Sequence, residues 1–436
     1  MLNIKKDLRS VIIAFCALTC GLLLLIPQQG TADPFSFAVT ADMRGYSGTG
    51  IYDTSRYFRG VCEAIAIAGP GAFMVSPGDI DPPASVKWTI EQHIDSTYTW
   101  YTVVGNHELP GAGIESYPGS NMDWLRNYNT GGNSLPNIVN VGPPGCQETT
   151  YSFDYQNAHF VVLNEYYDGS SDTGTDGDVV DALYNWLADD LATTTKQHIF
   201  VFGHEPAYPQ PDADNGRSRH IGDSLDKYPA RRDRFWELLR DQGVVAYFCG
   251  HTHSYSAVRI DGVWQLDAAH CRGAGDTGAP STFLIIHVTG DDLGHVTFNA
   301  YRDNHDGIYD YDDIVYSWDA SPPVELSSFT ARQEKGAVVL EWTTESENAH
   351  RGFILERRQK DTGHWNEIAR YTTHIELIGQ DSVSNRIKYK YVDSTVQFSL
   401  TYEYQLAVVS SDGQMEYLGT VEIIMTSDDI SPDDKI

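Results

Sequence analysis

The sequence has few basic residues, with 30 Lys and Arg against 60 Asp and Glu in 436 residues and a formal net charge of −30 at pH 7. This deficit argues against binding of nucleic acid or an anionic membrane through a basic face. The same charge repels phosphate esters at long range. A phosphate site in this chain therefore needs its own local positive charge, which bound divalent cations would provide.

Repeats at solenoid spacing and long low-complexity tracts are also lacking, and cysteine is scarce, with six in the chain. Two of the six, Cys16 and Cys20, lie in an N-terminal apolar segment. The other four are Cys62, Cys146, Cys249 and Cys271. Four cysteines permit three complete disulfide pairings, and the sequence alone does not choose among them.

The longest apolar stretch lies at 11–26, after three basic residues and before small residues that end at Ala32. This layout is typical of a secretory signal peptide at 1–32 that is cleaved after Ala32. A membrane anchor is the alternative, although the stretch is short for one, and lipid attachment at Cys20 is a third interpretation. We therefore expect a secreted, periplasmic or cell-surface protein.

The length predicts two domains, because 436 residues exceed one comfortable hydrophobic core. Over 33–320, short apolar runs alternate with helical patterns such as 178–194 and 231–242, in which apolar residues recur every three or four positions. This alternation is typical of an α/β fold. The number of strand-like runs is enough for two packed sheets, so a four-layer α/β/β/α sandwich fits best.

The pattern changes to period two beyond residue 323, where Val338, Leu340 and Trp342 alternate with other residues. Strands with one buried face and no helical segment predict an all-β, immunoglobulin-like sandwich over 324–425. The strings VELSSFTA and GFILER in this region resemble fibronectin type III-like modules appended to exported enzymes. A cell surface or another protein is the expected partner of such a module. The tail at 426–436 is acidic and is expected to be disordered.

Five short apolar runs each end at residues that can bind a metal. The first three end at Asp42, at Gly78-Asp79 and at Gly105-Asn106-His107-Glu108, and the last two end at Gly203-His204 and at Gly250-His251-Thr252-His253. Such runs are typical of strands buried on both faces, and ligands gather beyond the carboxyl ends of such strands in layered α/β folds. We therefore expect the five motifs to converge in space.

The residue types in these motifs suit a pair of metal ions. A bridging carboxylate can hold two divalent ions about 3.5 to 4 Å apart, while imidazoles and an amide oxygen complete the coordination. Such metals lower the pKa of a bridging water until it is a hydroxide near neutral pH, and that hydroxide can attack phosphorus in line. The order of the motifs is that of a two-metal phosphoesterase site.

Taken together, the motifs resemble the calcineurin-like metallophosphoesterase family, which includes the purple acid phosphatases, over nearly all of residues 35–300. The resemblance implies a phosphoric ester hydrolase with two divalent or trivalent ions of the iron, zinc or manganese type. It implies that Asp79 bridges the ions, that Asn106, His204 and His251 complete one site, and that Asp42 and His253 complete the other. It also implies that His107 is a catalytic residue beside the substrate, with Glu108 as its neighbour.

The sequence departs from the family pattern at two positions. Family members usually place His two residues after the first Asp, or Tyr three residues after the second, and these positions are Arg44 and Pro82 here. The first metal therefore keeps Asp42, Asp79 and His253 as its evident ligands and is expected to bind weakly. The Pro also argues against the purple iron chromophore.

Arg44 has two interpretations. It could act in catalysis by donating a fork of hydrogen bonds to the substrate phosphate, replacing the charge of a metal with a guanidinium. It could instead neutralise the acidic cluster of a decayed site. His220, Tyr208 and Tyr255 are candidate substrate-binding residues, because they lie in loops that are close in sequence to the motifs.

The favoured function is a secreted, metal-dependent phosphomonoesterase that acts on a phosphorylated small molecule. A phosphodiesterase is the alternative within the enzyme class, because metal ligands do not choose between monoesters and diesters. A catalytically impaired surface-binding protein with a degenerate metal site is the alternative outside it.

Overall fold

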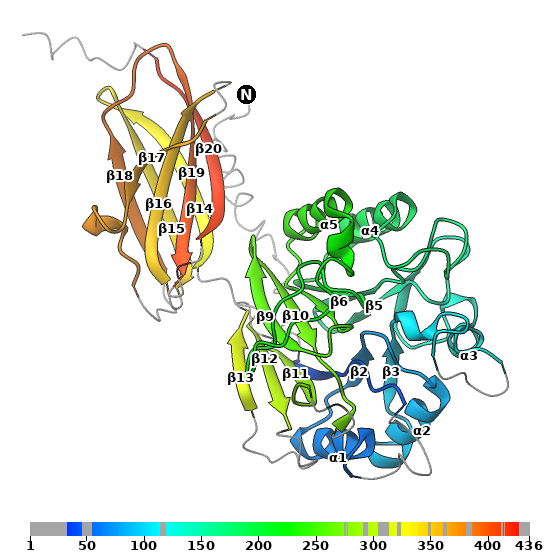
Figure 1. The fold of residues 1–436 in the computed structure, drawn as a ribbon. Coiled ribbons are helices and arrows are strands. Elements are labelled where there is room, and N and C mark those ends of the chain that lie inside the picture. The colour runs from blue at the N-terminus through cyan, green and yellow to red at the C-terminus, as the bar shows by residue number, and fades with distance from the viewer. Residues whose placement is uncertain are drawn as a thin grey trace, which may run out of the picture. The chain divides into compact units, whose positions relative to one another are not determined.

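The computed structural model describes residues 33–426 apart from 46–54, 114–118, 274–275, 277, 291–294, 304–313, 321–323, 348–349, 361–363, 381–385, 411–412 and 414. The expected signal peptide and acidic tail, except for Thr426, lie outside these described residues. Figure 1 shows the ribbon, with helices and strands labelled in chain order. No helix in the described ranges combines the length and the apolar character that crossing a membrane requires.

A six-stranded sheet contains the first three motif strands. Its order is β13-β12-β11-β1-β2-β3, formed by β1 (Phe35–Val39), β2 (Phe73–Ser76), β3 (Thr99–Thr102), β11 (Thr282–Val288), β12 (Val296–Arg302) and β13 (Ile314–Asp319). The strands β1, β2 and β3 are parallel to one another, and β11 pairs antiparallel with β1. The parallel part directs three carboxyl ends to the same edge of the sheet.

A seven-stranded sheet contains the last two motif strands. Its order is β4-β5-β6-β7-β8-β10-β9, formed by β4 (Ile138–Val141), β5 (Tyr151–Tyr155), β6 (Ala158–Val162), β7 (His198–Phe202), β8 (Ala246–Cys249), β9 (Tyr255–Ile260) and β10 (Val263–Ala268). The strands β6, β7, β8 and β10 are parallel. The two motifs that follow β7 and β8 therefore also share one edge.

The two sheets pack face to face through an aromatic core. Phe37 and Phe73 from the first sheet stack with ring centroids 5.4 Å apart, and Phe160 from the second sheet meets Phe37 edge-on at 5.2 Å. Phe202 and Phe248 stack at 4.9 Å within the second sheet. Aromatic pairs of this kind contribute about 0.5 to 1.5 kcal/mol each beyond the area that they bury. The core fixes the two motif-bearing edges against each other.

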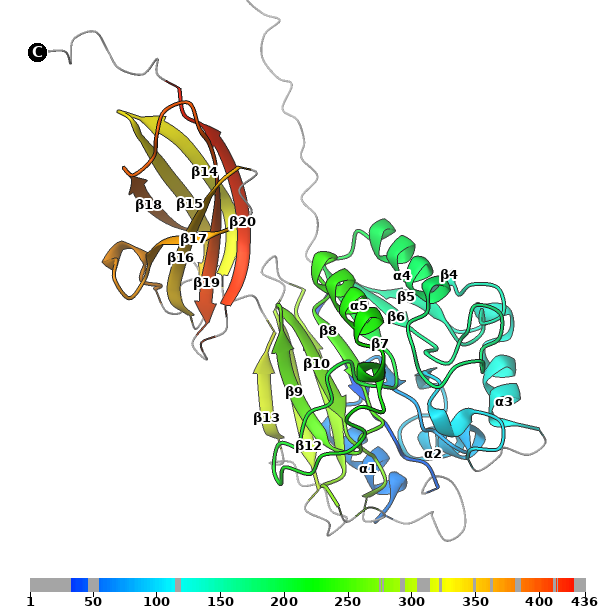
Figure 2. The same cartoon turned by 45° about the horizontal axis from the view of Figure 1, so that its top comes forward.

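Helices cover the outer faces of both sheets, as Figures 1 and 2 show. The helices are α1 (Phe58–Ala68), α2 (Pro83–His93), α3 (Asn121–Tyr128), α4 (Asp181–Thr193) and α5 (Pro229–Asp241). One apolar cluster joins α1, α2 and α3 to the first sheet, and another joins α4 and α5 to the second. The predicted four-layer α/β/β/α sandwich is confirmed, and so are the helices expected at 178–194 and 231–242.

Short 3-10 helices complete this part of the chain and recur once in the C-terminal part. They are Asn106–Glu108, Thr130–Gly132, Leu225–Lys227 and Ile375–Leu377. The cysteines Cys62, Cys146, Cys249 and Cys271 are all buried and free, so none of the three possible disulfide pairings is present in this structure.

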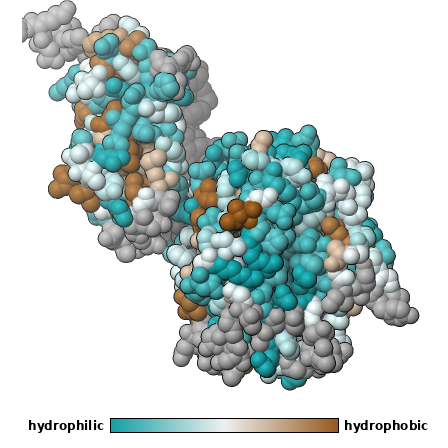
Figure 3. Space-filling view, viewed as in Figure 1, coloured by the Kyte–Doolittle hydropathy of each residue, from teal (hydrophilic) through white to brown (hydrophobic). Residues whose placement is uncertain are grey.

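Figure 3 shows one face of the α/β part of the chain, and this face carries mainly hydrophilic side chains.

The C-terminal residues form two antiparallel sheets. One has the order β14-β15-β18, formed by β14 (Val324–Glu334), β15 (Ala337–Glu347) and β18 (Ile387–Asp393), and the other has the order β17-β16-β19-β20, formed by β16 (His350–Gln359), β17 (Asn366–Arg370), β19 (Thr401–Ser410) and β20 (Met415–Ile424). Trp342, Phe353 and Tyr389 pack against one another in the core of this region, with ring centroids 4.8 to 5.4 Å apart. The predicted all-β character is confirmed, whereas the kinship to fibronectin type III-like modules stays a prediction.

Candidate functional site

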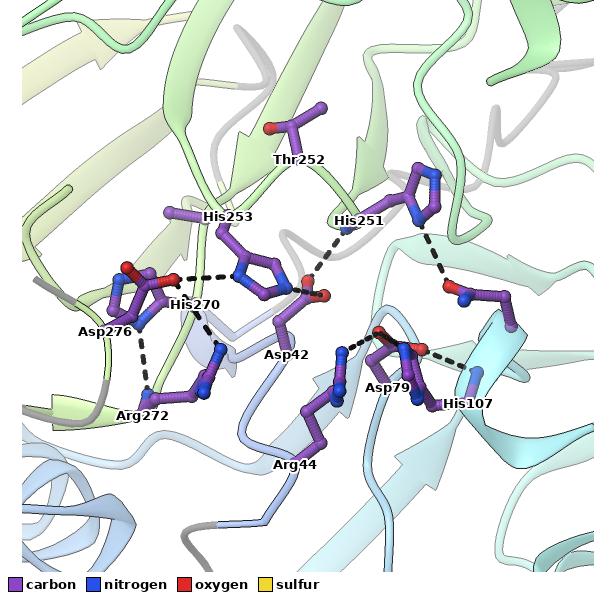
Figure 4. Close-up of polar contacts among 12 residues, drawn as sticks. Asp42, Arg44, Asp79, His107, His251, Thr252, His253, His270, Arg272 and Asp276 are labelled. Atoms are coloured by element: carbon purple, nitrogen blue, oxygen red, sulfur yellow. Dashed lines mark hydrogen bonds and ion pairs between the residues drawn. The ribbon is translucent and has the colours of Figure 1, made fainter. Parts of the chain in front are cut away.

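The five motifs converge, because each follows a strand whose carboxyl end lies at the same end of the two packed sheets. Asp42, Asp79 and Asn106 follow β1, β2 and β3, and His204 and His251 follow β7 and β8. Figure 4 shows residues from both sheets turned toward one another in a single cluster. The convergence expected from the sequence is confirmed for the six residues assigned as metal ligands.

Left-handed backbone conformations turn several of these side chains into the cluster. The φ angles are 52° at Asp42, 53° at Asp79, 69° at His251 and 55° at His253. A positive φ is uncommon outside glycine and costs about 1 to 3 kcal/mol where the surroundings hold it. Such strain gathers at functional sites, and here it falls on four candidate ligands.

Three ligand atoms meet on one side of the cluster. The Nε2 atom of His204 lies 3.1 Å from Oδ1 of Asn106 and 3.2 Å from Nδ1 of His251, and that Nδ1 atom lies 3.2 Å from the same Oδ1. The Nδ1 atom of His204 faces the carbonyl oxygen of Pro77 at 2.8 Å, so it carries the hydrogen of the neutral ring. The lone pairs of Nε2 and Oδ1 then face each other and need a cation between them.

Protonation of His204 is the alternative to a metal at this point. Burial lowers the pKa of His204, but Asp79 and Asp42 outweigh burial and raise it. His251 behaves in the opposite way, because burial and then His204 lower its pKa to about 2. His251 therefore presents a neutral ring, which is the form that binds metals.

The other side of the cluster contains Asp42, Asp79 and His253, which are all buried and offer ligand atoms within 4.8 Å of one another. Nε2 of His253 lies 3.3 Å from Oδ1 of Asp42, and no hydrogen bond satisfies that buried Oδ1 atom within the described structure. Nδ1 of the same ring donates to Oδ2 of Asp276 at 3.0 Å. A carboxylate that orients a metal-binding imidazole in this way is a common feature of metal sites.

Asp79 lies between the two sides. Its Oδ1 atom is 3.5 Å from Nε2 of His204 on one side, and the group with Asp42 and His253 lies on the other. Burial is the largest effect on Asp79 and raises its pKa. Burial also opposes ionisation of Asp42, but the neighbouring histidines, first His253 and then His204 and His251, together outweigh it and lower the pKa of Asp42.

Glycines leave the room that this cluster needs. A Cβ atom would lie 2.3 Å from Oδ2 of Asp42 if added at Gly250, 2.6 Å from Oδ1 of Asp79 at Gly105, and 2.4 Å from Nδ1 of His204 at Gly78. The glycine before each of these three motifs is therefore required by close approach of the ligand side chains. The unsatisfied Asp42 oxygen, the facing lone pairs and this crowded cradle fit a bound metal.

Glu108 holds two of the motif loops together, a role that the sequence reasoning missed. Its Oε2 atom accepts hydrogen bonds from the backbone N–H groups of Asp79 at 2.9 Å and Gly105 at 2.7 Å, and Oε1 accepts from Ile80 at 2.9 Å. The side chain is fully buried, and burial followed by the charge of Asp79 raises its pKa well above the usual value. The third motif contains Glu108, but the sequence does not show its three backbone partners, because they are brought to it by the fold.

Arg44 lies beside the bridging candidate, in the place where the family pattern has a ligand. Its Nη1 atom is 3.9 Å from Oδ2 of Asp79, and its Nε atom is 3.7 Å from Oδ1 of Asp81. The side chain keeps 30% of its surface exposed, whereas both carboxylates are buried. Figure 4 shows the guanidinium directed at Asp79. It can therefore contribute positive charge at the mouth of the cluster.

His107 and His220 also join the cluster. The backbone N–H of His107 donates to Oδ1 of Asp79 at 2.9 Å, and its Nε2 atom lies 3.9 Å from Oδ2 of the same residue. Burial lowers the pKa of His107. The ring of His220 lies against His251, with ring centroids 4.0 Å apart, and burial followed by Arg219 lowers the pKa of His220. Both candidates thus lie next to predicted metal ligands.

Tyr255 is a correction to the sequence interpretation, whereas a substrate contact of Tyr208 stays a prediction. Tyr208 packs edge-on against Trp236 of α5 with ring centroids 5.1 Å apart, and Arg232 covers its ring. Tyr255 is 1% exposed and accepts a hydrogen bond at its hydroxyl group from Trp318. The ring of Tyr255 is used in packing, because proximity in sequence to a motif does not set the direction of a side chain.

Asp276 is a second residue that the sequence reasoning missed. Besides orienting His253, its carboxylate accepts a hydrogen bond from Arg217 and forms an ion pair with Arg272. Burial would raise the pKa of Asp276, but His253, the backbone N–H of Gly278, His270 and Arg217 together outweigh it and lower the pKa. No sequence signal identified this residue, because it lies 23 positions after His253 and follows no apolar run.

The part of the chain that contains the five motifs matches a known protein family. The sequence matches the family described as calcineurin-like phosphoesterase over residues 35–255, which is half of the chain. No curated protein sequence is significantly similar to the chain.

Several solved structures are similar to the chain. GAP50, the anchor in the inner membrane complex of Plasmodium, shares 14% identity over 66% of this chain and 89% of that chain, with a TM-score of 0.41. The purple acid phosphatase PPD1 from yellow lupin (Lupinus luteus) seeds shares 15% identity over 65% of this chain and 55% of that chain, with a TM-score of 0.43. A Fn3-like protein from Clostridium thermocellum shares 16% identity over 24% of this chain and 97% of that chain, with a TM-score of 0.18.

Proposed function

Because the chain belongs to the calcineurin-like phosphoesterase family, whose members use divalent metals, we propose that it is a metal-dependent phosphomonoesterase acting on a phosphorylated small molecule. Family membership itself makes the chain a phosphoester hydrolase. The observation that supports the proposal most strongly is the position of Asp79 between two groups of candidate ligands, with its Oδ1 atom 3.5 Å from Nε2 of His204.

In the proposed site, Asp79 bridges two metal positions. Asn106, His204 and His251 complete one position, and Asp42 and His253 complete the other. These oxygen and nitrogen donors suit iron, zinc or manganese. Such ions, when bound, neutralise phosphoryl charge and lower the pKa of water so that it becomes a nucleophile.

The proposed role of Arg44 is to bind the phosphoryl group. Its guanidinium has more N–H donors than its contacts with Asp79 and Asp81 use, and its exposed part can present the others to a phosphate oxygen. The same guanidinium lies where the family pattern places a further ligand for the position completed by Asp42 and His253. We therefore propose that this position binds its ion more weakly than the position completed by Asn106.

His107 and His220 are proposed to contact the substrate from two sides. His107 is held by the hydrogen bond from its backbone N–H to Asp79, so its ring can donate to a phosphate oxygen or to the leaving group. His220 packs on His251 and can orient that ligand or contact a substrate oxygen. Neither proposal extends to Tyr255, whose ring is occupied in packing.

Export of the protein and a binding role for its C-terminal sandwich belong to the same proposal. The N-terminal segment has the charge and apolar pattern of a signal peptide, which supports a secreted, periplasmic or cell-surface location. Amino-terminal sequencing of the protein recovered outside the cytoplasm tests this part. A mature chain that starts at Asp33 is expected, and retention of the segment would contradict cleavage.

Hydrolysis of matched chromogenic esters tests the proposed activity. The full chain with restored metal is assayed on a phosphate monoester and on the diester with the same leaving group. We expect the monoester to have the higher kcat/KM. A preference for the diester would show that the protein is a phosphodiesterase and not a phosphomonoesterase. Absence of both activities would indicate a degenerate metal site.

Two pairs of variants separate loss of the site from general damage. Asn106→Ala and His251→Ala are expected to abolish turnover, because each removes a proposed ligand. Their controls are Asn366→Ala and His364→Ala, which change exposed residues of the C-terminal region. Equal activity in the ligand variants and the controls would contradict the proposed site.

A further inference from the structure

Two arginines contact the carboxylate of Asp276, and a third lies close to one of them in the chain. Nη1 of Arg217 lies 3.2 Å from its Oδ1 atom, and Nη1 of Arg272 lies 3.6 Å from its Oδ2 atom. Arg219 lies two residues beyond Arg217 in the same loop and directly before His220, whose ring lies against His251 with ring centroids 4.0 Å apart. Such a group of arginines is unexpected in a chain with a net charge of −30.

The carboxylate of Asp276 contacts Arg217, Arg272 and His253, and the described residues show no contact between this carboxylate and Arg219. Within the described ranges, no hydrogen bond or ion pair holds the half-buried guanidinium of Arg219. A partly desolvated charge without a partner is costly, so an anion from solution would be stabilised here. Guanidinium groups bind phosphate through paired N–H donors, which makes phosphate the best-matched anion.

The loop that carries Arg217 is held in place before any anion arrives. The backbone N–H of Asp212 donates to the carbonyl oxygen of Arg217 at 2.8 Å, and Oδ1 of Asn215 accepts from the backbone N–H of Arg217 at 2.9 Å. Nδ2 of Asn215 donates to the carbonyl oxygen of Gly278 at 3.0 Å. A Cβ atom at Gly278 would lie 2.3 Å from Nη1 of Arg217, so the glycine leaves room for the guanidinium.

A single imidazole ring separates this group from the proposed metal site. His253 contacts Asp42 through Nε2 at 3.3 Å and donates to Asp276 through Nδ1 at 3.0 Å. Figure 4 shows Arg272 beside Asp276 and Arg44 beside Asp79, with His253 and Asp42 between the two pairs. A phosphoryl group at the metal ligands and an anionic group at the arginines would thus be held one ring apart.

We propose that Arg217, Arg219 and Arg272 form a subsite for a second phosphate group, so that bisphosphorylated small molecules are the preferred substrates. This inference rests on the proposed phosphomonoesterase activity, because it assigns the second phosphate of the same substrate. Arg44 and the metal ligands bind the phosphoryl group that is cleaved. The three arginines bind the phosphate group that is retained.

Fructose 6-phosphate and fructose 1,6-bisphosphate test the subsite, because they differ by one phosphate group. Initial phosphate release by the metal-loaded full chain gives kcat/KM for each. We expect the bisphosphate to be preferred by about tenfold or more, since a hydrogen bond to a charged group is sufficient for that factor. Arg219→Ala should reduce this preference to near unity, Arg219→Lys should restore part of it, and Arg240→Ala, at an exposed surface arginine, should leave it unchanged.

Calorimetric binding of fructose 1,6-bisphosphate to the full chain separates failure of the subsite from failure of the proposed activity. Hydrolysis of both sugar phosphates without a preference that depends on Arg219 would overturn the subsite and leave the phosphomonoesterase intact. Binding that is weakened in Arg219→Ala without turnover of either compound would support the subsite and contradict the proposed activity. Absence of both binding and turnover would overturn both.

Discussion

The Nε2 atom of His204 lies 3.1 Å from Oδ1 of Asn106. The other ring nitrogen, Nδ1, donates its hydrogen to the carbonyl oxygen of Pro77, so Nε2 of the neutral ring has only a lone pair. Two acceptors at this distance are stabilised by a cation. The buried carboxylate of Asp79 lies 3.5 Å from the same nitrogen and favours positive charge there. This relationship supports the proposal that the position completed by Asn106 binds its ion more tightly than the position completed by Asp42 and His253.

Substitution of the amide ligand tests that assignment. Asn106→Ala is expected to lower both metal affinity and kcat by more than about 100-fold, because loss of an outer partner alone costs about 10- to 100-fold in metal sites. Metal content after dialysis and turnover at saturating substrate are measured on the same samples. Unchanged metal content would show that Asn106 is not a ligand.

Replacement of Arg44 tests whether this residue occupies the place of a metal ligand. Arg44→His is expected to raise bound metal toward two per chain, because an imidazole would complete the position of Asp42, Asp79 and His253. Arg44→Lys keeps the charge without a metal ligand and serves as the control. Metal counting by mass spectrometry checks both. The same stoichiometry and activity in Arg44→His and the wild type would refute the missing-ligand argument.

Glu108 is expected to act through the loops rather than through the substrate. In Glu108→Gln, an amide NH2 group replaces a carboxylate oxygen that accepts a hydrogen bond from a backbone N–H. The NH2 group and the backbone N–H are both donors and would face each other. We expect a loss of about 1 to 3 kcal/mol in the free energy of unfolding of the metal-free chain. Urea unfolding measures this loss, and Glu237→Gln on α5 is the control. Equal midpoints for the two variants would argue against the positioning role.

A buried histidine away from the site predicts a pH effect on stability. His159 contacts Asp154 through Nδ1 at 2.8 Å and Asp190 through Nε2 at 2.9 Å. Burial lowers the pKa of His159, but the two hydrogen-bonded carboxylates outweigh it and raise the pKa. Because the folded pKa exceeds the unfolded value of about 6.5, the stabilising contribution is complete below that pH. It is lost as the pH rises through the folded pKa.

Urea unfolding of the wild type and His159→Gln between pH 6 and 8.5 checks this sign. The wild type is expected to lose more stability than the variant as the pH rises, because only the wild type loses a proton from this position. Parallel pH profiles for the two chains would mean that His159 does not contribute in its charged form.

Much of this arrangement could be predicted from sequence because the ligands directly follow strands. Asp42, Asp79 and His251 each lie within a few residues of a short, mainly apolar run, and parallel packing brings such positions together. The helical periodicity at 178–194 identified α4 for an equally local reason, since a helix shows its buried face within the segment itself.

The remaining features depend on contacts between distant segments. Asp276 orients His253 from a loop 23 positions away, and Glu108 binds backbone groups that no side-chain pattern records. Tyr255 was assigned to the substrate site wrongly, because its position two residues after His253 suggested a substrate contact. The strand β9 begins at Tyr255, and the fold buries the ring.

Metal-dependent turnover of a chromogenic phosphate monoester tests the central claim most directly. The chain from Asp33 onward is stripped of metal, assayed, reloaded with iron, zinc or manganese and assayed again, with bound metal counted in each sample. The account predicts that activity disappears with the metal and returns when the position completed by Asn106 is filled. Activity that survives metal removal, or bound metal without any turnover, would contradict it.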